Sequence, residues 1–161
     1  MKKFLLYFTA LCLVACNGNA PEGGDDEFVD LGLDSGTKWK IQNEENTNDY
    51  YDLFDYETAI SEFGSNLPTA DQWEELRINC HWEWTGSEYE VTGPNGKTIV
   101  LPATGKRECS TGNVIGVGEK GYYWSSASLG LDDAWFQFFD SRTMYLDYSS
   151  SCYGLAVRLV R

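Results

Sequence analysis

Cysteine and histidine are the residues with which this chain could most readily do chemistry, and both are scarce. The sequence holds one histidine, His81, and five cysteines, at Cys12, Cys16, Cys80, Cys109 and Cys152. No two cysteines have the close CxxC spacing that a structural zinc site uses. Nothing near His81 in the sequence forms a catalytic triad, so we interpret it as a structural or surface residue.

Residues 1–15 have the pattern of a secretory signal peptide, with Lys2 and Lys3 before an apolar stretch too short to remain as a membrane span. The ending LVAC resembles the bacterial lipoprotein signal, in which the cysteine becomes the lipidated first residue. Cys16 is therefore the predicted lipidation site and the contact with the membrane, because lipid chains bury methylenes at about 0.8 kcal/mol each. Residues 16–27 are small, polar and acidic, which is typical of a flexible tether.

Three cysteines remain once Cys12 leaves with the signal and Cys16 takes the lipid. In an oxidising compartment at most one disulfide can form among them, and the sequence does not indicate which pair. Removing residues 1–15 leaves 146 residues, enough for one domain with a single core. We place this domain at residues 28–161.

The charge of the chain argues against nucleic acid and anionic lipid as partners. The formal net charge is −13, and removing Lys2 and Lys3 leaves ten basic residues against 25 acidic ones, or −15. A field of this sign repels nucleic acid and anionic lipid, so no nucleic-acid partner is expected. No cofactor is predicted, although calcium stays open, because hard oxygen ligands are present without a recognised spacing. These ligands are Asp132, Asp133, Asp140 and Asp147.

The clearest local signal is a helix within residues 67–80. Thr69 followed three residues later by Gln72 forms a capping box, in which each side chain satisfies an open backbone amide. The spacing directs one face of the helix toward the core; its members are Trp73, Leu76, Arg77 and Cys80. Glu74 and Glu75 are expected on the solvent side, because adjacent helical residues do not form a catalytic pair.

The remaining elements are a second helix and short strands. Asp55 can cap a helix over residues 56–63, and residues 28–40 are predicted to form a strand, a turn and a second strand. The apolar run 155–160 needs a partner, and we expect it to pair with residues 28–40, so that the two ends of the domain close on each other. Residues 105–121 are predicted to form a long loop.

The last predicted strands carry aromatic residues on both of their faces, that is, at odd and at even positions. Met144 and Leu146 share one phase and should point inward, which directs Tyr145 and Asp147 outward. We assign Trp124, Phe136 and Phe138 to the scaffold. Tyrosine and serine are the residues from which adaptable binding surfaces are built. The predicted contact residues are Trp135, Gln137, Arg142, Tyr145, Asp147, Tyr148 and Tyr153.

Several segments together resemble the Fibrobacter succinogenes major paralogous domain, a family common in lipoproteins of Bacteroides-like bacteria. The matching stretches are VDLGLDSGTKW, LPTADQWEEL, NCHWEWT, VTGPNGKTIVLPATG, GYYWSSAS and YGLAVRLVR, in the family's order. Residues 41–51 depart from the family's pattern. The family is similar to the formylglycine-generating-enzyme branch of the C-type lectin fold. The resemblance therefore implies an α+β, C-type-lectin-like single domain, with two helices packed on short antiparallel sheets and with paired terminal strands.

The resemblance implies two functions of different classes. The same branch includes the variable proteins of diversity-generating retroelements, which bind ligands through the exposed side of their last strands. This implies a module that binds a protein or a glycan. Diversification by a retroelement is also a hypothesis for residues 147–154, because changing the adenines of an asparagine codon gives the residue types Asp, Tyr, Ser, Cys and Gly found there. The alternative is a cysteine-dependent oxidase of exported proteins, in which Cys109 and Cys152 bind copper. In either case we expect an outer-membrane lipoprotein, and Asp25, Asp26 and Glu27 resemble a signal for export to the outer face.

Overall fold

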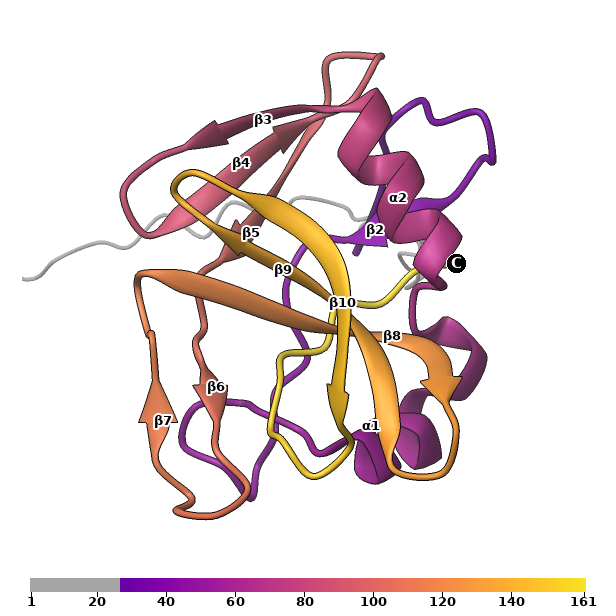
Figure 1. Cartoon of the computed structure of the whole chain (residues 1–161). Coiled ribbons are helices and arrows are strands. Elements are labelled where there is room, and N and C mark those ends of the chain that lie inside the picture. Colours follow the sequence, from indigo (N-terminus) through magenta and orange to yellow (C-terminus); the bar gives the residue numbers. More distant parts are fainter. Residues whose placement is uncertain (1–26) are drawn as a thin grey trace, which may run out of the picture.

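The computed structural model describes residues 27–161 (Figure 1), so the predicted signal peptide, Cys16 and the tether up to residue 26 lie outside the described residues. The described part is an α+β domain with two α-helices and short antiparallel sheets, as predicted. The helices are α1 (Tyr56–Phe63) and α2 (Ala70–Asn79), with a 3-10 turn at Gly64–Asn66 between them. Neither helix in this part of the chain has the length and apolarity needed to cross a membrane.

The strands form four antiparallel sheets within the described residues. In chain order the strands are β1 (Phe28–Asp30), β2 (Lys38–Lys40), β3 (His81–Trp84), β4 (Glu88–Thr92), β5 (Thr98–Pro102), β6 (Lys106–Arg107), β7 (Val114–Ile115), β8 (Lys120–Leu129), β9 (Asp133–Asp140) and β10 (Met144–Ser150). β1 pairs with β2 and β6 with β7, while β3–β4–β5 and β10–β9–β8 are three-stranded. The pairing of β6 with β7 corrects the prediction that residues 105–121 form only a loop.

Both helices begin at the predicted caps. The Asp55 side chain accepts a hydrogen bond from the backbone N of Thr58 at 2.9 Å. The Thr69 hydroxyl accepts from the backbone N of Gln72 at 3.1 Å, and the Gln72 amide oxygen accepts from the backbone N of Thr69 at 2.9 Å. Each bond satisfies an amide that the first turn of a helix leaves open. The capping box is therefore confirmed.

The outer side of α2 differs from the prediction. Glu75 is not simply solvated, because its carboxylate accepts hydrogen bonds from the backbone N of Ser35 at 2.9 Å and from the Ser35 hydroxyl at 2.5 Å. Glu74 forms an ion pair with Arg77. Glu75 therefore fixes the turn between β1 and β2 against α2, which sequence spacing within the helix could not reveal.

The two ends of the domain close on each other as predicted. Val160 forms an antiparallel bridge with Trp39, and Lys38 and Arg161 exchange backbone hydrogen bonds of 3.0 and 3.1 Å. The run 155–160 is not one regular strand, however. Its residues pair in turn with different segments, so that Leu155 bridges Phe54 before Val160 reaches β2. The C-terminal run therefore ties together several parts of the fold.

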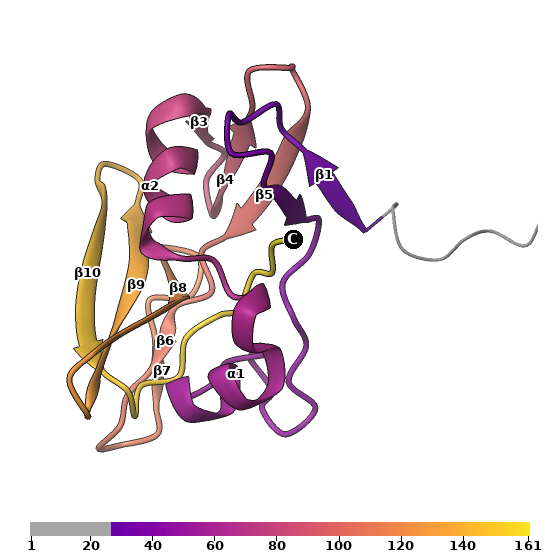
Figure 2. The same cartoon turned by 90° about the vertical axis from the view of Figure 1, so that its right-hand side faces the viewer.

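The C-terminal sheet β8–β9–β10 lies between two apolar clusters. One contains Trp39, Trp73 and Tyr123, and the other contains Phe54 and Trp124. Figure 2 shows β10 on one side of the domain and β1 on the opposite side, with α2 and α1 between them. The described chain therefore begins on the side away from β10.

Candidate ligand-binding face

The centre of one face of the C-terminal sheet is covered by α2. Tyr123 of β8 and Phe139 of β9 are fully buried on this face, with ring centroids 5.7 Å apart. Trp73 of α2 packs on Tyr123 at 5.7 Å and donates from its ring nitrogen to the backbone oxygen of Trp124 at 3.3 Å. This region is core, and it offers no surface to a ligand.

The opposite face carries a row of three rings, one from each strand. Tyr122 lies beside Phe138 in the register of β8 and β9, and Phe138 lies beside Tyr145 in the register of β9 and β10. The ring centroids are 5.1 and 4.8 Å apart, separations at which aromatic pairs attract. Tyr122 and Phe138 are each 8% exposed, whereas Tyr145 is 45% exposed. We call Tyr122, Phe138 and Tyr145 the ring row; it is a packed base that ends in an exposed tyrosine.

The hydroxyl of Tyr122 stays protonated at neutral pH. Burial raises the pKa of Tyr122, and the nearby Tyr145 and Asp140 raise it further. A protonated phenol can both donate and accept a hydrogen bond. The ring row therefore combines apolar ring surface with hydroxyl groups.

Lys106 of β6 places a positive charge beside the ring row. Its ammonium nitrogen lies 4.2 Å from the ring centroid of Tyr153 and 5.3 Å from that of Tyr122. The faces of aromatic rings attract cations at such distances. Among residues 27–161, no carboxylate forms an ion pair with Lys106. The ammonium group is therefore held by rings and keeps its capacity to bind an anionic or polar group.

A disulfide between Cys109 and Cys152 holds Tyr153 near Lys106. The Cα atoms of the two cysteines are 5.4 Å apart. Next to them, Arg107 and Gly154 exchange backbone hydrogen bonds of 2.8 and 3.0 Å. A Cβ atom added to Gly154 would lie 2.8 Å from the Arg107 guanidinium carbon, so a larger residue here would displace the Arg107 side chain. The loop after β10 is thus fixed to β6 at the edge of the ring row.

The same disulfide bears on the oxidase interpretation. That interpretation requires Cys109 and Cys152 to be close, and they are bonded to each other and exposed. In a disulfide neither sulfur is a thiolate, which is the form that binds a metal. The pair as it stands does not fit a copper site. The third cysteine, Cys80, packs beside the core, and burial followed by the charge of Glu75 raises its pKa to about 11.

The predicted contact residues do not lie on one surface. Tyr145 and Asp147 point away from the α2 side, as predicted, and Tyr153 joins this face through Lys106. Trp135 and Tyr148 belong to the other face of the sheet, the one whose centre α2 covers. Their ring centroids are 5.5 Å apart, and Tyr148 is 50% exposed. A ligand on the ring row would not reach this second pair without crossing β10.

Gln137 and Arg142 complete the predicted set. Gln137 is fully buried, so its prediction as a contact residue is wrong. It shares the α2 side with Phe139, its amide nitrogen donates to the backbone oxygen of Phe138 at 2.8 Å, and its amide oxygen has no hydrogen-bond partner among the described residues. Arg142 is exposed in the turn between β9 and β10. Sequence reasoning missed Lys106, and it assigned Phe138 to the scaffold alone.

The four aspartates considered for calcium are not brought together. Residues 27–161 contain no group of three or more His, Cys, Asp or Glu side chains that could hold a metal ion. One oxygen of Asp140 instead accepts from the backbone N of Arg142 and of Thr143, and these bonds lower the pKa of Asp140. Asp147 accepts from the backbone N of Tyr148 at 2.9 Å. His81 is exposed at the start of β3.

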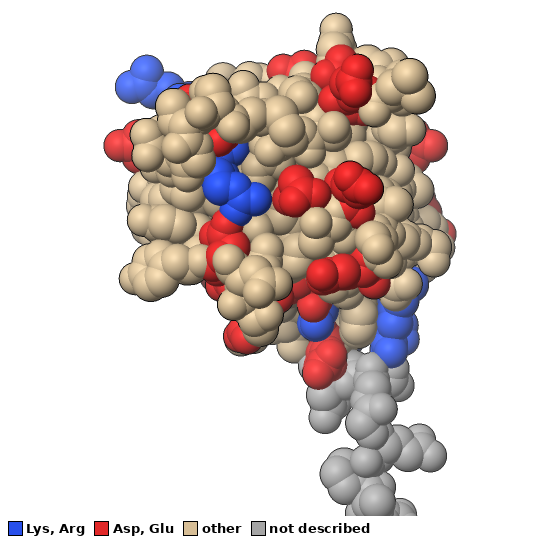
Figure 3. Space-filling view, turned by 90° about the horizontal axis from the view of Figure 1, so that it is seen from below, with Lys and Arg blue, Asp and Glu red and all other residues tan. Residues whose placement is uncertain are grey.

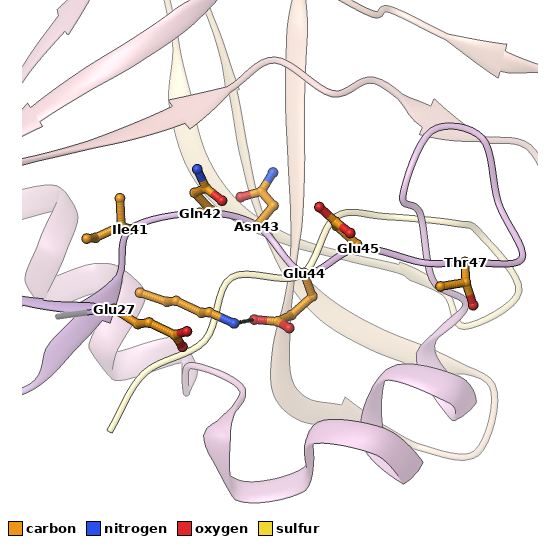
Figure 4. A pocket seen from close by; sticks show the side chains of 8 residues that line it. Glu27, Ile41, Gln42, Asn43, Glu44, Glu45 and Thr47 are labelled. Atoms are coloured by element: carbon orange, nitrogen blue, oxygen red, sulfur yellow. Dashed lines mark hydrogen bonds and ion pairs between the residues drawn. The ribbon is translucent and has the colours of Figure 1, made fainter. Parts of the chain in front are cut away.

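Several hollows lie away from the ring row. One, of about 520 Å³, is formed mainly by the loop after β2 (Figure 4). Its lining includes Glu27, Glu45 and the ion pair of Lys40 with Glu44. A second hollow of about 380 Å³ lies beside Trp84 and the turn that carries Arg142. Neither hollow includes a residue of the ring row.

Acidic side chains outnumber basic ones at the end of the molecule that carries α1 and the β6–β7 hairpin (Figure 3). This distribution follows from the net charge of −13. Comparisons of the chain with protein-family models, with curated proteins and with solved structures found no match. The site therefore has to be interpreted from its own residues.

Proposed function

We propose that the protein is a binding module whose ligand lies against the ring row and the adjoining side chains of Lys106, Asp147 and Tyr153. The observation that carries this proposal is the ring row itself, which runs across three strands and ends at the exposed Tyr145. Rings fixed by packing supply contact area with little loss of side-chain freedom. The chemistry suits a protein or glycan ligand that stacks on rings and hydrogen-bonds to the polar groups beside them.

The position of the N-terminus supports this orientation. β1 and β10 lie on opposite sides of the domain (Figure 2), so a chain held at its N-terminus would present the C-terminal sheet away from the anchor. We propose that the anchor is a lipid on Cys16 and that the protein is an outer-membrane lipoprotein. The N-terminal sequence pattern supports this part of the proposal.

We also propose that the fold is C-type-lectin-like, of the formylglycine-generating-enzyme branch. The closure of the two ends and the terminal position of the three-stranded sheet support this assignment. It is consistent with a binding role, because variable proteins of that branch bind through their last strands.

Arrays of immobilised glycans and proteins test the proposed function. Wild type should retain a set of ligands that Tyr145→Ala and Lys106→Met each lose. Tyr50→Ala is the matched control, because Tyr50 is an exposed tyrosine in the loop between β2 and α1. Equal retention of every ligand by wild type and by Tyr145→Ala would show that the ring row is not the binding face.

A further inference from the structure

The free edge of β10 offers hydrogen-bonding groups that face no other strand. β10 is the edge strand of its sheet, and within residues 27–161 no strand pairs with its second edge. Its seven residues pair with β9 in continuous register, whereas β8 and β9 are interrupted between Trp124 and Ser128. A long, regular edge strand is a template on which another strand can form.

The hydrogen bonds of the hairpin identify which groups point outward. Asp140 donates from its backbone N to the oxygen of Thr143 at 2.9 Å, and Ser151 donates to the oxygen of Asp132 at 2.7 Å. Residues that face the partner strand alternate with residues that face away. The backbone groups of residues 143, 145, 147, 149 and 151 therefore point to β9. Those of Met144, Leu146, Tyr148 and Ser150 point to the free edge.

Neighbouring groups of the same chain already occupy part of this edge. The Tyr148 backbone N donates to the Asp147 carboxylate at 2.9 Å, and the Ser150 oxygen accepts from the backbone N of Tyr153 at 3.2 Å. The outward groups of Met144 and Leu146 have no backbone partner among the described residues. Asp147 thus covers one outward donor and leaves the first half of the edge open.

We propose that an extended polypeptide segment of neutral or positive charge binds by adding a strand to the free edge of β10. This inference rests on the proposed function, with which it shares the Tyr145 end of the ring row, and it names the ligand as a peptide and not a glycan. Backbone pairing would supply the affinity, and Tyr145 on one face and Tyr148 on the other would contact alternate side chains of the added strand.

Charge and geometry select this occupant over two others. A second copy of the chain would bring together two bodies that each carry a net charge of −13, which opposes association. Residues 17–26 of the chain itself are acidic and lack large apolar side chains. The described chain begins next to β1, on the opposite side of the domain from β10 (Figure 2).

The test uses immobilised nine-residue peptides of alternating valine and threonine with a lysine at each end. The same peptides with two consecutive central amides N-methylated are the first control, because methylation blocks both edges of the strand. Met144→Pro removes an outward N–H, while Met144→Ala removes the side chain and keeps that N–H. We expect Met144→Pro to bind about tenfold more weakly than Met144→Ala, the effect of one lost hydrogen bond and a steric block. The thermal unfolding midpoint of both variants confirms that they fold.

Asp147 supplies a prediction in the opposite direction. Asp147→Ala and Asp147→Asn remove the same charge, but only Asp147→Ala frees the Tyr148 N–H, so Asp147→Ala should bind the peptide more tightly than Asp147→Asn. Equal binding of plain and methylated peptides, equal binding by Met144→Pro and Met144→Ala, or no retention of the plain peptides would overturn the inference. If glycans are then still retained in a manner that depends on Tyr145, the proposed function stands and only the peptide assignment falls.

Discussion

Replacing Arg158 tests the closure of the domain. Arg158 is 1% exposed although it lies in the apolar run 155–160. Its guanidinium donates to the side-chain oxygen of Asn43 at 2.8 Å and to three backbone oxygens, those of Lys40 at 2.7 Å, Ile41 at 2.6 Å and Val100 at 2.6 Å. Burial lowers the pKa of Arg158, but a guanidinium remains charged in proteins. The side chain therefore joins the C-terminal run to the loop after β2 and to β5.

The cost of Arg158→Ala follows from these four bonds. Truncation removes the donor from four part-buried hydrogen bonds, and each acceptor left without a partner costs about 1–3 kcal/mol where water does not replace the guanidinium. We expect a loss of about 4 kcal/mol or more, against a total stability of about 5–15 kcal/mol for a domain. The stability of Arg158→Lys should lie between that of wild type and that of Arg158→Ala, because an ammonium group lacks the forked geometry of the guanidinium.

Urea unfolding, followed by tryptophan fluorescence, measures this effect. Arg142→Ala is the matched control, because Arg142 is exposed in a turn, and it should change the free energy of unfolding by less than about 0.5 kcal/mol. A loss below about 1 kcal/mol for Arg158→Ala would refute the reasoning, since a single unsatisfied buried acceptor should already cost that much.

Three further predictions concern stability. Reducing the Cys109–Cys152 disulfide, which spans 43 residues, should lower the free energy of unfolding by about 2–4 kcal/mol, and an unchanged urea midpoint in reductant would contradict this. Burial raises the pKa of Tyr123 from 10.0 to about 12, so its contribution to stability is complete below pH 10 and is lost as pH rises toward 12. Tyr123→Phe should reduce the fall of the thermal unfolding midpoint with pH over that range. The same pH slope in both proteins would exclude Tyr123 as the cause. Thr69→Ala should cost about 1 kcal/mol by removing the helix cap, whereas Thr69→Ser should cost little; equal losses would show that the hydroxyl is not the stabilising group.

The elements with strong local signals were predictable from the sequence. Thr69 and Gln72 predicted the start of α2 because a capping box depends on residues three apart. The pairing of the chain ends was also predictable, since the apolar run 155–160 needed a partner. The β6–β7 hairpin was missed because its strands have two residues each, which is too short for an alternating pattern.

The candidate site was only partly predictable. β9 is aromatic on both phases because the sheet is packed on both faces, so the alternation that normally separates core from surface is absent. Gln137 was predicted as a contact residue, yet it lies on the face that α2 covers. The meeting of Lys106 with Tyr153 depends on the disulfide and on the pairing of Arg107 with Gly154, neither of which leaves a local pattern in the sequence.

Hydrogen–deuterium exchange on the protein with a ligand retained on the arrays tests the central claim most directly. We predict that the ligand slows amide exchange in β10 and near Lys106 and Tyr153, and leaves exchange in β3–β4–β5 unchanged. Protection confined to β3–β4–β5, or to the loop after β2 that forms the larger hollow, would contradict the assignment of the ring row as the binding face.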